Sequence, residues 1–370
     1  MKRNVKVFGA ALDASDLGLA IQMKLAYLNR LVNGLIEESD FLDPYDGLLN
    51  LSKLLKRDFF KKIGKFPIES WLTPKPRLMD IPLINQLNYQ NFTNEGNLKN
   101  CSERLKEFVQ KEIFPDIPLM LGVDHSLTGG VLTAISQEVG NDDLLVIIFD
   151  AHFDGLPASM TLKIAEYVND HPQVANPLIL VNNPLQFEKL NLKDNYTCAS
   201  FLHYLLKQET ILPENLIIFG CQDYPNEEYR SIDNSGIIEF VAFFDELECS
   251  GVNFIPINEP LEMLRSLNQT LKGVNTNNLY LSFDVDVCAL KEVIATRFRN
   301  VIGVDKSTLI NATHIINKYK KSKNVEIKGL DIMEIDTHLL NKFFPKSNRI
   351  DQTIEVIDDY LEALFSENLS

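Results

Sequence analysis

The chain has 370 residues, of which 45% are hydrophobic and 24% charged, and its formal net charge is -15 at pH 7. This composition is typical of a globular protein, and the acidic excess argues against nucleic acid or an anionic membrane surface as a partner. The sequence contains no apolar run of about 18 residues and no secretory signal, and its five cysteines are scattered, so we expect a cytoplasmic protein with reduced thiols.

The amino-terminal part predicts a strand, then a helix, then an irregular segment. Val5 to Ala10 has the pattern of a strand, and apolar residues recur at helical spacing from Leu19 to about Ile36. From Asp40 to Glu95, prolines and glycines interrupt short helix-like pieces such as Leu48 to Lys62. We interpret residues 40–95 as an irregular insertion in a single domain of residues 1–370. This segment would either lie over the sheet beside the mouth of a pocket or be a packed segment with a structural role alone.

Strand-like and helix-like segments then alternate along the chain. We expect strands at Pro118–Leu121, Leu144–Phe149, Leu178–Val181, Leu216–Phe219, Ile237–Phe244, Leu279–Phe283 and Val325–Ile332. We expect helices near Leu98–Glu112, Thr161–Val168, Ala199–Leu206, Leu261–Leu271, Val304–Tyr319 and Ile350–Leu364. Strands separated by helices of this length form parallel sheets through right-handed crossovers, so the predicted fold class is α/β with a doubly wound sheet.

Acidic and histidine side chains follow four of these expected strands. They are His125 after the first, Asp150, His152 and Asp154 after the second, Asp284 and Asp286 after the third, and Glu334 after the last. The carboxyl ends of parallel strands meet at one edge of a sheet, so these side chains should lie close together. Aspartates gathered in a crevice repel one another unless a cation neutralises them, and carboxylates with imidazoles suit hard divalent ions such as manganese.

The segment Asp150 to Asp154, taken alone, leaves two interpretations open. Alternate residues of an extended segment share a face, so Asp150, His152 and Asp154 could chelate a metal together. In the other interpretation Asp150 caps a turn, His152 is a core histidine and Asp154 is solvated. The choice depends on the remaining motifs.

These motifs together resemble the ureohydrolases, which include arginases, agmatinases and formimidoylglutamases. The resemblance rests on LGVDHS at Leu121–Ser126, DAHFD at Asp150–Asp154, SFDVD at Ser282–Asp286 and GLDIMEID at Gly329–Asp336. Their order and strand-end positions match the family from about Pro118 to Leu339. The resemblance implies a three-layer α/β/α fold with a mainly parallel eight-stranded sheet and a centre of two Mn²⁺ ions.

The resemblance also implies a role for each of these residues. One ion would be held by His125, Asp150, Asp154 and Asp284, and the other by His152, Asp150, Asp284 and Asp286. Two such ions lower the pKa of a water that they share, which makes hydroxide available at neutral pH. Asp154 would orient this nucleophile and accept its proton, and Glu334 would pair with the guanidinium of the substrate. The products would be urea and an amine.

The chain departs from the family pattern near the expected site. Asp336 and Thr337 replace an Asn-Pro pair after Glu334, and the segment after Asp154 lacks the Asn, Ser and His-Gly elements that arginases use there. The usual proton-shuttling histidine is therefore absent. His203 is the candidate that we single out to replace it, although such a histidine is more often an ordinary helix residue.

The missing polar groups also bear on the substrate. Arginases hold the α-amino and α-carboxylate groups of free arginine through this loop, and burying such charges without partners is costly. We therefore expect a larger guanidino substrate, with an arginine-containing peptide first and an agmatine-like small molecule second. An amidohydrolase or deacetylase-like use of the same fold, and a metal-binding pseudoenzyme or regulatory subunit, are further alternatives. The sequence is compatible with a homo-oligomer.

Overall fold

The computed structural model describes residues 3–15, 17–36, 41–171, 193–345 and 348–369. An eight-stranded sheet with the order β2-β1-β3-β8-β7-β4-β5-β6 forms its centre, and all neighbouring strands are parallel. The strands are β1 (Val5–Ala10), β2 (Phe60–Lys65), β3 (Ile117–Gly122), β4 (Leu144–Phe149), β5 (Leu216–Phe219), β6 (Asn253–Ile255), β7 (Asn278–Asp284) and β8 (Glu326–Met333). The predicted α/β class with a parallel, doubly wound sheet is confirmed.

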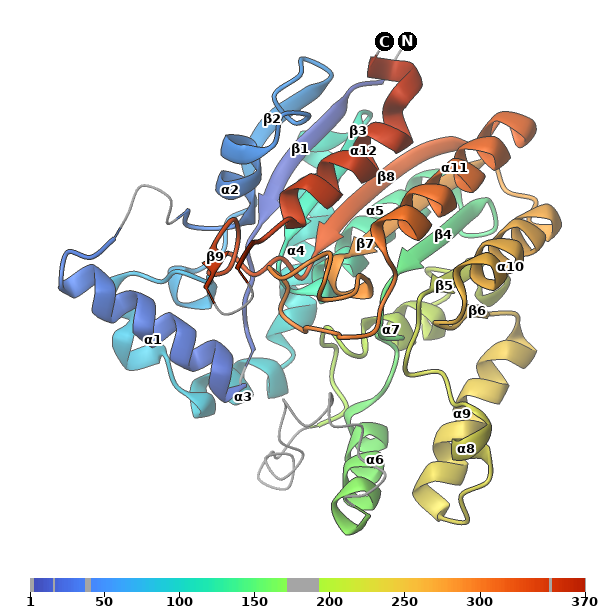
Figure 1. Ribbon diagram of the computed structural model, residues 1–370, viewed down its shortest axis with the longest axis horizontal. Coiled ribbons are helices and arrows are strands. Elements are labelled where there is room, and N and C mark those ends of the chain that lie inside the picture. Colours follow the sequence, from blue (N-terminus) through green and yellow to red (C-terminus); the bar gives the residue numbers. More distant parts are fainter. Residues whose placement is uncertain (1–2, 16, 37–40, 172–192, 346–347, 370) are drawn as a thin grey trace.

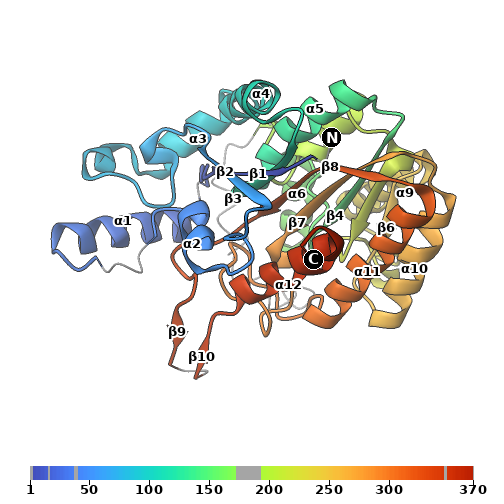
Figure 2. The ribbon, with the colours of Figure 1, turned by 90° about the horizontal axis from the view of Figure 1, so that it is seen from above.

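Helices cover both faces of the sheet and give the expected three layers (Figure 2). One face carries α2 (Pro44–Leu51), α10 (Pro260–Gly273), α11 (Lys306–Lys323) and α12 (Thr353–Leu369). The opposite face carries α4 (Asn97–Phe108), α5 (Thr128–Val139), α7 (Phe201–Lys207) and α9 (Ser235–Ser250). On the side toward which the strands point lie α1 (Gly18–Val32), α3 (Gln86–Asn94) and α6 (Ala158–Asp170) (Figure 1). The short helix α8 (Glu227–Arg230) precedes α9, and β9 (Phe343–Phe344) pairs antiparallel with β10 (Arg349–Ile350) in a separate two-stranded sheet.

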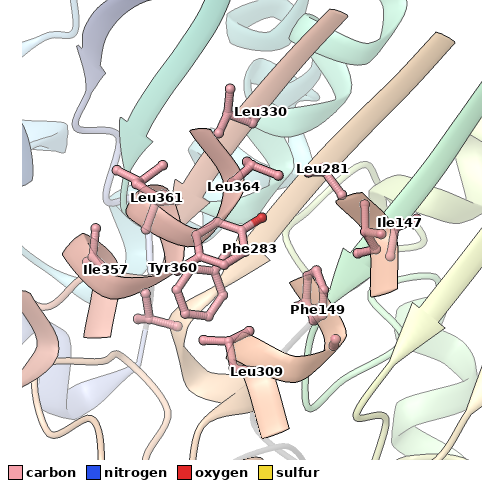
Figure 3. Close-up of a cluster of buried hydrophobic side chains, with 14 of the residues drawn as sticks. Ile147, Phe149, Leu281, Phe283, Leu309, Leu330, Ile357, Tyr360, Leu361 and Leu364 are labelled. Atoms are coloured by element: carbon pink, nitrogen blue, oxygen red, sulfur yellow. The ribbon is translucent and has the colours of Figure 1, made fainter. Parts of the chain in front are cut away.

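Buried side chains hold the central strands rigidly between these helices. Every residue of β4 is buried, as expected for a strand covered on both faces. On one of these faces, the ring of Tyr360 in α12 lies 6.1 Å from that of Phe149 and 4.8 Å from that of Phe283 (Figure 3). The strand ends that follow Phe149 and Phe283 are therefore fixed to a packed core.

Two sequence-based expectations are wrong. The predicted strand Ile237–Phe244 is part of helix α9, which begins after Asn234, whose side chain accepts hydrogen bonds from the backbone N–H groups of Gly236 and Ile237. The predicted helix-like piece Leu48–Lys62 ends as a helix at Leu51, and residues 60–65 form β2. Part of the predicted insertion thus belongs to the sheet, because β2 pairs with β1.

Other differences concern the extent of the sheet. Strand β6 lay outside the expected strands, and it pairs with β5 at one edge. The expected strand Leu178–Val181 lies outside the described residues. In the part of the chain that the structure describes, no helix combines the length and the apolar character needed to span a membrane.

Candidate metal centre

The side chains predicted to bind metal lie together where β3, β4 and β7 end. They form two groups, in each of which one potential ligand atom per residue lies within 4.8 Å of the others. The first group is His125, Asp150, Asp154 and Asp284, and the second is Asp150, His152 and Asp286. Asp150 thus belongs to both groups. Among the described residues Asp284 belongs to the first group alone, so its bridging role stays a prediction.

The first group surrounds one buried imidazole nitrogen. Nδ1 of His125 lies 2.8 Å from Oδ2 of Asp154, 3.2 Å from Oδ2 of Asp150 and 3.3 Å from Oδ2 of Asp284. The side chain of His125 is completely buried, and the ring of Phe201 packs against it with 5.1 Å between ring centroids. Three carboxylates therefore converge on one fixed nitrogen.

The second group is more open to solvent. Nδ1 of His152 lies 3.0 Å from Oδ2 of Asp286 and 3.6 Å from Oδ1 of Asp150. The side chain of His152 is 32% exposed, whereas Asp286 is fully buried. The ring of Phe298 meets the His152 ring edge-on at 5.6 Å. A small molecule would reach the centre from the side of His152.

A chain of hydrogen bonds fixes the orientation of His125. Its Nε2 lies 2.8 Å from Oγ of Ser282, and this hydroxyl donates to Oδ1 of Asp331 at 2.6 Å. The hydroxyls of Thr128 and Tyr280 donate to the other oxygen of Asp331. Because the Ser282 hydroxyl donates its hydrogen to Asp331, its oxygen accepts a hydrogen bond from Nε2–H of His125, and in the neutral form of the ring the Nδ1 lone pair then faces the carboxylates. This tautomer is the one that a metal-binding histidine needs.

The ionisation of these groups reflects carboxylates packed without a counter-charge. Burial and then the negative charge of Asp150 raise the pKa of Asp154 to about 7. Burial, followed by the charges of Asp286 and Asp150, raises the pKa of Asp284 well above its usual value. Burial lowers the pKa of His125, but the three surrounding carboxylates outweigh burial and raise it well above its usual value. Each of these shifts corresponds to a charge imbalance that divalent cations would remove.

Unpaired buried atoms show that the donor set fits metal ions. Among the described residues, Nδ1 of His125, Oδ2 of Asp150 and Oδ2 of Asp286 are buried and none of them has a neighbour in hydrogen-bonding geometry, although the carboxylates and imidazoles are close together. Buried polar atoms normally have a hydrogen-bond partner, so these three atoms are suited to bind a cation instead. Carboxylate oxygens with two imidazoles are a ligand set for hard divalent ions such as manganese.

The candidate substrate carboxylate, Glu334, follows β8 beside this centre. The residue is 5% exposed, and its backbone N–H donates to the carbonyl of Val123. Burial and then the charge of Asp284 raise the pKa of Glu334 well above its usual value, and the nearby Arg297 opposes this shift. Glu334 has φ 60° and Asp154 has φ 53°, a left-handed conformation that is uncommon outside glycine and recurs at functional sites.

Residues 194–202 hold the loops that carry His125 and Asp154, and no motif in the sequence predicted this contact. Tyr196 donates a hydrogen bond from its hydroxyl to the carbonyl of Ser126, next to His125. The backbone N–H of Leu202 donates to the carbonyl of Asp154 at 3.0 Å. This segment therefore fixes both the loop of His125 and the loop of Asp154. No local pattern could reveal contacts that depend on distant loops.

His203 lies on α7, but geometry disfavours the shuttle role predicted for it. Phe201, two residues earlier, packs on His125, and residues two apart in a helix do not share a face. The ring of His203 instead meets Tyr204 edge-on at 5.3 Å, and burial together with Lys207 lowers its pKa. Its role as a shuttle stays a prediction.

Comparison with known proteins identifies the class of this fold and site. The Arginase family model matches residues 62–343. The chain is 25% identical over 280 residues to an arginase of Staphylococcus aureus (strain MRSA252), a match that covers 72% of this chain and 80% of that relative. It is 28% identical over 216 residues to the arginase of Bacillus subtilis (strain 168), with 56% and 60% covered.

Solved structures show the same fold at low sequence identity. Proclavaminate amidino hydrolase from Streptomyces clavuligerus aligns with a TM-score of 0.55 and 16% identity, over 100% of this chain and 92% of that one. A putative agmatinase from Clostridium difficile aligns with a TM-score of 0.55 and 17% identity, over 100% and 99% of the two chains. The chain therefore belongs to the Arginase family, whose match spans most of its length.

Proposed function

We propose that the chain is a manganese-dependent amidinohydrolase that converts a guanidino group into urea and an amine. The observation that carries this proposal is the pair of histidine and aspartate groups that share Asp150, with buried Glu334 beside them. A pair of divalent cations, when bound, would supply Lewis acidity and lower the pKa of a water. A metal-binding pseudoenzyme would need neither a buried carboxylate for the substrate nor an exposed path past His152.

The residues of this chain would perform the remaining steps. Glu334 would bind the guanidinium by paired, charge-assisted hydrogen bonds, because a carboxylate matches the planar fork of that cation. Asp154 would accept a proton from the attacking water and thereby orient it toward the guanidinium carbon. The water oxygen bonds to that carbon, the bond from the carbon to the substituted nitrogen breaks, and this nitrogen leaves as a protonated amine.

We propose an arginine side chain within a peptide as the substrate. The segment after Asp154 supplies Gly155, Leu156 and Pro157 before α6 begins at Ala158, so it offers apolar groups where a free amino acid would need polar partners. The net charge of -15 would attract a basic peptide. Agmatine also lacks an α-carboxylate and is the second candidate, in keeping with the agmatinase named among the structural neighbours.

Mass spectrometry can decide between these substrates. The Mn²⁺-loaded protein is incubated with an arginine-containing peptide, agmatine and free arginine, each in a separate reaction. We expect the peptide to show the net loss of CH₂N₂ that converts arginine into ornithine, with urea released in equal amount. Efficient hydrolysis of agmatine or free arginine, with the peptide unchanged, would contradict the peptide proposal. Release of an acyl group without urea would favour the amidohydrolase alternative.

Removal of metal should lower the stability of the fold. A ligand that binds only the folded chain stabilises it by about 2.7 kcal/mol when its free concentration is about 100 times Kd. We therefore expect the unfolding midpoint to fall when a chelator removes the metal, because the buried aspartates then repel one another. The midpoint should recover when excess Mn²⁺ is added. Scanning calorimetry with and without chelator measures this effect. An Asp150→Asn variant, altered at the residue shared by both groups, should respond much less, and an unchanged wild-type midpoint would contradict the proposed coupling.

A further inference from the structure

A buried group of charged residues lies beside the metal centre at the end of β1. The guanidinium of Arg297 forms a bidentate pair with Asp13, with Nη1 3.1 Å from Oδ2 and Nη2 2.7 Å from Oδ1. Lys24 approaches the same carboxylate, with Nζ 3.6 Å from Oδ2, and also donates to the backbone carbonyl of Asp13. The side chains of Asp13 and Lys24 are each 1% exposed and that of Arg297 is 10% exposed. This is an extensive ion-pair arrangement for the interior of a protein.

Arg297 is a direct cross-strand neighbour of Glu334. Thr296 and Ile335 form an antiparallel bridge, and the backbone N–H of Arg297 donates to the carbonyl of Glu334 at 3.0 Å. This hydrogen bond holds the two backbones side by side, and the charge of each residue shifts the pKa of the other. The side chain of Arg297 is long and flexible, so its guanidinium could reach the carboxylate of Glu334 by a change of side-chain conformation.

This closeness creates a competition in a site that binds guanidinium groups. A carboxylate that recognises the guanidinium of a substrate recognises that of an internal arginine by the same paired hydrogen bonds. The internal group would have the advantage, because it is tethered next to Glu334 and needs no association step. A functional site therefore requires another partner that keeps Arg297 engaged.

We propose that Asp13 is a positioning residue that holds the guanidinium of Arg297 away from Glu334, and so keeps Glu334 available for the guanidino group of the substrate. This inference rests on the proposed function of Glu334. Nη1 and Nη2 of Arg297 each donate to one oxygen of the Asp13 carboxylate. While these bonds hold, the guanidinium of Arg297 does not compete with the substrate for Glu334.

The surroundings of Asp13 fix it in this role. Lys24, which holds the backbone and carboxylate of Asp13, is itself bonded to the hydroxyl of Tyr89 at 3.1 Å, and this hydroxyl donates to the carbonyl of Trp71 at 2.9 Å. The backbone N–H of Asp13 donates to the carbonyl of Leu72 at 2.6 Å. Burial raises the pKa of Asp13, but Arg297 and Lys24 outweigh burial and lower it, so the carboxylate is ionised at neutral pH. Part of the segment at residues 40–95 thus supports the substrate site indirectly.

The first test compares KM in a single variant with KM in the corresponding double variant. In Asp13→Asn the released Arg297 should occupy Glu334, and occupancy of about nine-tenths raises KM for the guanidino substrate about tenfold. We expect kcat at saturation and the Mn²⁺ content to change little. Adding Arg297→Met to this variant removes the competitor and should restore KM to within about threefold of wild type. A double variant with a KM as high as that of Asp13→Asn would overturn the proposal, because a purely structural role predicts no recovery.

Two matched variants complete the kinetic test. Asp245→Asn removes the carboxylate of an exposed pair with Arg230, whose atoms lie 2.8 Å apart, and should leave KM unchanged. Arg297→Met alone should not raise KM at a pH high enough to keep Glu334 ionised without this nearby positive charge, because Arg297 makes no contact with the substrate in this scheme and Asp13 keeps Lys24 as its partner. A tenfold increase of KM in Arg297→Met would overturn the proposal, even if Asp13→Asn did not fold.

A crystal structure of Asp13→Asn gives a readout that is independent of activity. We expect the guanidinium of Arg297 to have moved onto the carboxylate of Glu334, and a guanidinium that remains beside Asn at position 13 would overturn the proposal. This measurement also separates the two hypotheses. A wild-type protein that hydrolyses no guanidino compound would refute the proposed function, whereas the position of Arg297 in the variant would still decide whether Asp13 restrains it.

Discussion

The Asp154→Asn variant is expected to remain folded and to lose hydrolysis almost completely. The amide that replaces the carboxylate cannot accept the proton of the attacking water and is a weaker metal ligand. A loss of about 10⁴-fold in kcat is the size seen when a central catalytic carboxylate is removed. Asparagine tolerates the φ of 53° found at this position, so the backbone can keep its conformation. Turnover, circular dichroism and bound manganese, measured on one preparation, test this expectation.

A matched control for Asp154→Asn lies at the start of the same strand. Asp142 is exposed and precedes β4, whereas Asp154 follows β4 and is buried among the metal-centre residues. Asp142→Asn should keep full activity. Full activity in Asp154→Asn would refute the role of Asp154 as proton acceptor, and loss of folding in both variants would point to a structural cause.

Glu334→Gln should reduce catalysis far more than it reduces metal binding. Glutamine has the same shape but lacks the negative charge that pairs with a guanidinium. Truncating one partner of a buried charge pair costs about 2–5 kcal/mol. At about 1.4 kcal/mol per factor of ten, kcat/KM should fall between roughly 30-fold and 4000-fold. Steady-state kinetics and metal analysis of the purified variant measure the two effects separately.

The control for Glu334→Gln is at the other end of β8. Glu326 is exposed at the first position of this strand and pairs with Lys328 at 2.7 Å. Glu326→Gln should leave kcat/KM unchanged. If manganese content fell in proportion to activity in Glu334→Gln, Glu334 would be a metal ligand or a support for one, and the proposed substrate contact would be wrong.

From the sequence it could be predicted that the acids and histidines that follow buried strands lie close together. The apolar run of β4 and the acids after it are local patterns, and the parallel sheet brings such strand ends together. The same rule applies to Asp13, which follows β1, but Asp13 belongs to none of the motifs on which the predicted site was based. Its partner Arg297 is 284 positions away, and no local pattern links two residues at that separation.

The errors in secondary structure have a similar physical origin. A short apolar run fits a buried strand and a buried helix equally well, and Ile237 to Phe244 was assigned to the wrong one. In α9 the buried residues Ile237, Phe240 and Phe244 recur at helical spacing, which a longer window would have favoured. Residues 60–65, FKKIGK, carry three lysines and a glycine because β2 is an edge strand, and edge strands lack the continuous apolar pattern of central ones.

Substitution by glycine would relieve the conformational strain of the left-handed backbone at Asp154 and Glu334. Other residues in this conformation cost roughly 1–2 kcal/mol each, and glycine adopts it freely. Glycine at either position would therefore be expected to make the folded chain more stable while removing a carboxylate from the site. The chain nevertheless has an acid at both positions, one at the end of β4 and one at the end of β8. Backbone strain of this kind is found mainly where surrounding structure holds a residue for binding or catalysis.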